Sequence, residues 1–111
     1  MSLLVTRYKE DNFDSIIFEC VERALSTLGT TQQEFVIFTL KKEYQVSTKN
    51  LGKEAFRLEE ILKRLLGPSV SSFVIMHILD YVATEFKFIS NYGSTLAQTI
   101  EKAKRIYDAR I

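Results

Sequence analysis

The chain has 111 residues, 46% of them hydrophobic, with eight phenylalanines and five tyrosines. This apolar content suffices for one domain that needs no disulfide or metal to hold its core. One proline and four glycines leave too few turn residues for the many short strands of a sandwich or barrel, so we expect an all-α fold. The net charge of +1 excludes the strong positive field of a protein that depends on phosphate contacts.

Cysteine use and the first residues bear on where the protein works. Cys20 is the single cysteine and cannot form an internal disulfide, and residues 1–7 lack the apolar core of a secretory signal. We therefore expect a cytoplasmic protein. We expect a single helical domain that spans residues 1–111, in which residues 1–11 are flexible or loosely packed.

A faint internal repeat organises the chain. Leu28-Gly29 is followed six residues later by Phe35-Val36-Ile37, and Leu66-Gly67 is followed at the same distance by Phe73-Val74-Ile75. A glycine in the left-handed conformation typically ends a helix, so each glycine predicts a helical hairpin.

The first hairpin combines two amphipathic runs. The first helix is predicted from Asn12 or Asp14 to Leu28. The second is predicted from Gln32 to Tyr44, because Thr31 precedes Glu34 by three residues in the pattern of a capping box. The expected core side of the second helix consists of Phe35, Ile37, Phe38, Leu40 and Tyr44.

The second hairpin follows an irregular stretch at 45–52. Helices are predicted at 53–66 and from 69 to about 88, separated by Gly67 and Pro68, since proline restricts the residue before it. The later helix is apolar on nearly every side and is interrupted by charged residues, which are costly inside a bilayer. We expect it to be the central buried helix rather than a membrane span.

A fifth helix is predicted after a turn at 91–94. Its narrow apolar stripe either completes the core or packs against another chain, and consists of Leu96, Ile100, Ala103 and Tyr107. The expected architecture is a compact bundle of about five helices, made of two glycine-terminated hairpins and a C-terminal helix. We expect a homodimer that uses this stripe and the exposed side of the fourth helix.

No catalytic or metal-binding motif is visible. His77 has Asp80 and Tyr81 on the same helical side, but the sequence has no second histidine for a zinc site, and a hydrogen-bonded helical residue is the favoured interpretation. Cys20 lies on an apolar face, where cysteine behaves as a small hydrophobic residue. We expect no enzymatic activity and no cofactor.

Charged residues in the middle of the chain allow two interpretations. Glu59 and Glu60 are explained by helical pairing with Lys63 and Arg64. The basic residues of segment 41–64 form either a solvated face, which is favoured, or a nucleic-acid interface: Lys41, Lys42, Lys49, Lys53, Arg57 and Arg64.

The stretch from Ala24 to about Val82 resembles the Nitrosopumilus output domain, a small archaeal all-helical family found alone and fused to signalling modules. The resemblance is carried by residues 24–29 (Ala-Leu-Ser-Thr-Leu-Gly), residues 40–44 (Leu-Lys-Lys-Glu-Tyr), and Phe56 and Leu62 leading to Leu66-Gly67. It implies an archaeal cytoplasmic protein without assigned chemistry. The combined expectation is a non-enzymatic interaction or regulatory module that binds a protein or itself, with nucleic-acid binding as the alternative.

Overall fold

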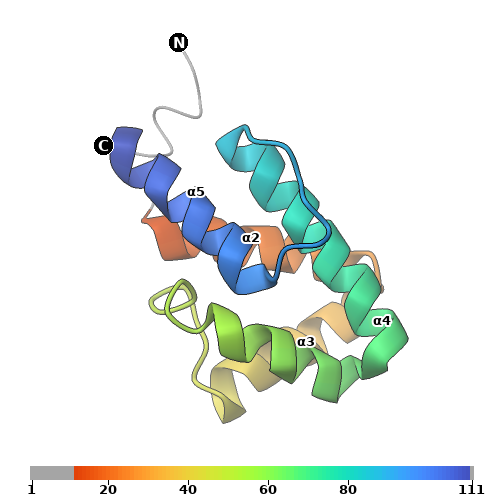
Figure 1. Ribbon diagram of the computed structural model, residues 1–111. Helices are drawn as coiled ribbons and strands as arrows, with labels where there is room; N and C mark the ends of the chain where they lie inside the picture. Colours follow the sequence, from red (N-terminus) through yellow and green to blue (C-terminus); the bar gives the residue numbers. More distant parts are fainter. Residues whose placement is uncertain (1–11, 111) are drawn as a thin grey trace.

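The computed structural model describes residues 12–110, and every regular element in that range is a helix (Figure 1). The helices are α2 (Phe13–Ser26), α3 (Thr30–Glu43), α4 (Ala55–Phe86) and α5 (Leu96–Arg110). The all-α class is confirmed, with four helices in the described range instead of the five expected. The predicted flexibility of residues 1–11 concerns a segment outside the described residues.

The central helix is α2. It begins at Phe13 because the Asn12 side chain caps it, accepting a hydrogen bond from the Ser15 N–H at 2.8 Å. It packs closely on α3 and α4 and more lightly on α5. Its buried side chains form the middle of the core: Phe13, Ile16, Ile17, Phe18, Cys20, Val21, Ala24 and Leu25.

The turn between α2 and α3 differs from the one predicted. Gly29 has φ 96° and ψ 157°, a region open almost only to glycine, and it serves as the N-cap of α3. Because the chain turns directly into the helix at Thr30, Thr31 falls within the first turn. The predicted capping box is therefore wrong, and α3 has no side-chain cap.

The predicted break at Gly67 is a sharp kink inside α4 (Figure 1). Gly67 has φ 82° and ψ 167°, nearly the conformation of Gly29, and Pro68 opens the second arm. Proline is suited to the first helical position because its missing N–H would have no partner there. The two predicted helices are thus two arms, residues 55–66 and 68–86, joined without a loop.

The second arm of α4 is buried on one side only. Val74, Ile78 and Val82 are fully buried, whereas Phe73 and Met76 are exposed. The prediction that this arm is the central buried helix is wrong, because α2 occupies that position.

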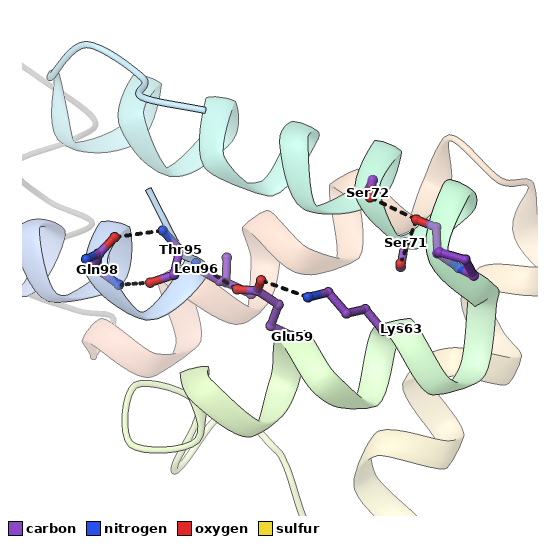
Figure 2. Close-up of polar contacts among 8 residues, drawn as sticks. Glu59, Lys63, Ser71, Ser72, Thr95, Leu96 and Gln98 are labelled. Carbon is purple, nitrogen blue, oxygen red and sulfur yellow. Dashed lines mark hydrogen bonds and ion pairs between the residues drawn. The ribbon is translucent and has the colours of Figure 1, made fainter. Parts of the chain in front are cut away.

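The α5 helix completes the core. Its N-cap is reciprocal: Thr95 N–H donates to Gln98 Oε1 at 2.8 Å, and Gln98 N–H donates to Thr95 Oγ1 at 3.1 Å (Figure 2). Three members of the predicted stripe are buried against α2 and α4, namely Leu96, Ile100 and Ala103. The fourth, Tyr107, is half-buried, with its ring 5.4 Å from that of Phe13.

This placement decides between the two alternatives for the stripe. It belongs to the core of a single chain and is not an exposed face, so it cannot serve as the dimer interface in this fold. The homodimer itself stays a prediction.

Candidate interaction surface

The outer side of α3 exposes two large aromatic side chains. Phe35 is 52% exposed and Phe38 is 63% exposed, and residues three apart lie on the same side of a helix. The opposite side packs on α2 through Val36 and Leu40, which are fully buried. The expectation that both phenylalanines belong to the core is therefore wrong, because α2 covers the 36/40 side of α3 and leaves the 35/38 side open.

Two oppositely charged residues flank these rings. Glu34 and Lys41 are exposed and line the same shallow depression beside Phe38. Lys41 Nζ lies 5.3 Å from the ring centroid of Phe18, and Glu34 makes no ion pair with any of residues 12–110. We call the set of Glu34, Phe35, Phe38, Lys41 and Lys42 the α3 face.

The internal repeat reappears as a repeat of burial. Phe73 on the second arm of α4 is 45% exposed and the next residue, Val74, is fully buried, just as Phe35 is exposed and the next residue, Val36, is fully buried on α3. Met76, the counterpart of Phe38, is 37% exposed. Both helices that start from a positive-φ glycine therefore present a large apolar pair to solvent.

His77 lies in a row of aromatic rings. Its ring centroid is 4.5 Å from that of Phe73 and 6.2 Å from that of Tyr81, over which the Arg23 guanidinium lies at 4.5 Å. The Asp80 carboxylate is hydrogen-bonded to the segment after α4 and not to the imidazole. That carboxylate accepts hydrogen bonds from Ser90 Oγ and Tyr92 OH, each at 2.7 Å.

The other candidate reactive residues have structural contacts. Cys20 is 1% exposed in the core and forms no disulfide. Glu59 pairs with Lys63 at 3.4 Å, as predicted, whereas the predicted pair of Glu60 and Arg64 is not formed. Across residues 12–110 there is no group of three or more His, Cys, Asp or Glu side chains able to hold a metal ion.

The six predicted basic residues are all exposed, but they are spread over three parts of the chain. Lys41 and Lys42 end α3, Lys49 and Lys53 lie in the following segment, and the two arginines lie on the first arm of α4. Arg57 is already engaged: it forms an ion pair with Glu54 and donates to the Tyr44 carbonyl at 3.3 Å.

By length and composition alone, α4 also meets the criterion for a membrane span, with a mean hydropathy of 1.4 in its most apolar window. A third of that window is buried inside the fold. Because core helices of globular proteins meet the same criterion, this is weak support for a span, and the kink at Gly67 interrupts the helix.

Comparisons with known protein families, with curated proteins and with solved structures found no match to this chain. The resemblance to the Nitrosopumilus output domain therefore stays a prediction.

Proposed function

We propose that this protein is a non-enzymatic interaction or regulatory module that binds another polypeptide through the α3 face. The observation that carries the proposal is the exposure of Phe35 and Phe38, at 52% and 63%, between charged residues of opposite sign. Buried aromatic side chains supply most of the binding energy at protein interfaces, and a charged rim selects the partner. Neither ring is needed for the core, because Val36 and Leu40 already fill the contact with α2.

The two residues best suited to catalysis occupy positions that favour structural roles. The Cys20 thiol is enclosed in the core, and the His77 ring is packed against Phe73 and Tyr81. This arrangement supports binding in preference to acid–base or nucleophilic chemistry.

A site-specific photo-crosslinker tests the proposal. A photoreactive phenylalanine analogue at position 38 is expected to give adducts in extracts of cells that make the protein, whereas the same group at the exposed position 102 of α5 gives none. Excess unmodified protein is expected to compete, and excess Phe35→Asp/Phe38→Asp protein is not. The proposal fails if position 38 gives no adduct or gives the same adducts as position 102.

Nucleic-acid binding is the second candidate, favoured by the exposure of all six basic residues. Binding through four or more of them would weaken steeply with salt, because each phosphate contact releases counterions. It would also respond to substitution of Lys53, which makes no ion pair with any of residues 12–110. An absence of binding to duplex or single-stranded probes at low salt would exclude this candidate.

A further inference from the structure

We propose that the partner of the α3 face is a second copy of this chain, docked antiparallel about a two-fold axis that passes between Phe35 and Phe38. This inference rests on the proposed function and names the partner. It follows from the order of charges and rings along one helix.

The rings are self-complementary. An antiparallel two-fold axis midway between residues 35 and 38 places Phe35 of each protomer opposite the partner's Phe38. Both rings are more than half exposed, so each can be covered by the other without displacing a side chain from the core.

The charges are self-complementary about nearly the same axis. Glu34 and Lys41 are seven residues apart and therefore lie on the same flank of α3, two turns from one another. In the antiparallel arrangement that flank meets its own copy, and Glu34 faces the partner's Lys41 twice. The midpoint of this pair differs from that of the rings by one residue, about 1.5 Å of helix rise.

The parallel arrangement is disfavoured by the same residues. It would place the flank that carries Glu34 and Lys41 on opposite edges of the interface in the two protomers, so neither opposite-charge pair would form. Lys42, which is in line with the two rings, would face the partner's Lys42 in the parallel pair, where like charges oppose association. The antiparallel axis instead sets it against the partner's Thr31, which is uncharged.

The size of the α3 face sets the expected strength. α3 has 14 residues and is about 21 Å long. Two such helices bury less than the roughly 800 Å² per partner of a standard interface, so we expect dissociation in the micromolar range.

Sedimentation across a concentration series, from about 1 µM to about 500 µM, tests the inference on the full chain. The unmodified protein is expected to convert from monomer to dimer. Phe38→Asp is expected to remain monomeric throughout, because it places a charge opposite an aromatic ring at both symmetric positions. Phe56→Asp is the matched control: this phenylalanine is 70% exposed on the first arm of α4 and is expected to leave dimerisation unchanged.

Charge reversal tests the antiparallel geometry. Glu34→Lys alone and Lys41→Glu alone each create two like-charge pairs and are expected to weaken the dimer about five- to twentyfold. Mixing the two variants restores both opposite-charge pairs, so a heterodimer of near-original affinity is expected. Glu60→Lys, on the exposed side of α4, controls for net charge.

Three results would overturn the inference: a monomer at every concentration, a dimer that Phe38→Asp leaves intact, or a mixture of the charge variants that fails to recover. Circular dichroism of each variant checks that the helices are retained. A monomer that still forms a position-38 adduct with a different protein would overturn self-association and leave the proposed function standing. Failure of both experiments would remove the binding role of the α3 face.

Discussion

Glu59 Oε1 accepts a hydrogen bond from the backbone N–H of Leu96 at 2.9 Å, across 37 residues of chain (Figure 2). The contact places a carboxylate on the first arm of α4 at the N-terminus of α5, where free N–H groups and the helix dipole favour negative charge. It fixes the start of the last helix against the first arm of α4.

We expect Glu59→Ala to lower the free energy of unfolding by about 1–2 kcal/mol, because it removes a charged cap and leaves the Leu96 N–H without that acceptor. Urea denaturation measures the change. Lys63→Ala is the control, since its ion pair with Glu59 is exposed and is expected to contribute less than about 1 kcal/mol. Equal effects of the two substitutions would contradict the capping role.

Gly29→Ala and Gly67→Ala are expected to destabilise the fold by similar amounts, about 1–3 kcal/mol each, because both residues have a backbone conformation that other residues rarely adopt. An added Cβ would meet no atom within 4 Å at either position, so the cost is one of backbone strain alone. Gly93→Ala is expected to cost less, because φ is not positive there and the added Cβ would meet only the exposed Asn91 side chain, at 3.2 Å. Thermal or urea unfolding with a smaller loss at Gly29 or Gly67 than at Gly93 would disprove the assignment.

Lys87→Gly is expected to stabilise the protein by about 1 kcal/mol. Lys87 ends α4 with φ 62°, in the left-handed region, where a non-glycine residue pays a steric penalty that glycine avoids. Gln45, with φ 52° after α3, is expected to behave in the same way. Lys63→Gly, inside the first arm of α4, is expected to lower the free energy of unfolding by about 1 kcal/mol, because glycine disfavours a helix interior. Denaturation curves of the three variants therefore distinguish the relief of strain at a left-handed residue from a general effect of glycine.

The pKa of Tyr92 is raised above 10.0, because its hydroxyl donates to the Asp80 carboxylate, which disfavours the tyrosinate. A folded-state pKa above the unfolded value contributes stability that is present below pH 10 and is lost as the pH rises through the folded pKa. Tyr92→Phe and Asp80→Asn are both expected to remove this alkaline dependence from the unfolding free energy. The link would be refuted by a spectrophotometric titration in which Asp80→Asn does not lower the pKa of the tyrosine that ionises at the highest pH.

Helix positions could largely be predicted from the sequence, because glycine and proline act locally. The change of direction at Gly29 and the kink at Gly67 are fixed by backbone conformations that need no tertiary contact. The exact starts of the helices could not be predicted so well. Thr31 has the spacing of a capping residue, but the helix begins before it once Gly29 adopts its extended positive-φ conformation.

Which apolar side of a helix is buried could not be read from spacing alone. α3 carries one apolar stripe through Val36 and Leu40 and another through Phe35 and Phe38, and only the packing of α2 decides between them. The second stripe, which the packing of α2 leaves exposed, is the sequence signal on which the proposed contact rests. For α5 the sequence left core and interface open, and the burial of Leu96 and Ile100 places the stripe in the core.

The packing of α3 has a consequence for local stability. Among the four described helices, α3 packs substantially on α2 alone, whereas α4 and α5 contact both α2 and each other. A helix attached on one side can open while the remaining three stay folded, so we expect α3 to form a separate, less protected unit of hydrogen exchange. Association through the outer side of α3 would raise the protection of its amides toward that of the other helices. The slowing of α3 amide exchange with increasing protein concentration would then measure how strongly assembly and the local stability of α3 are coupled.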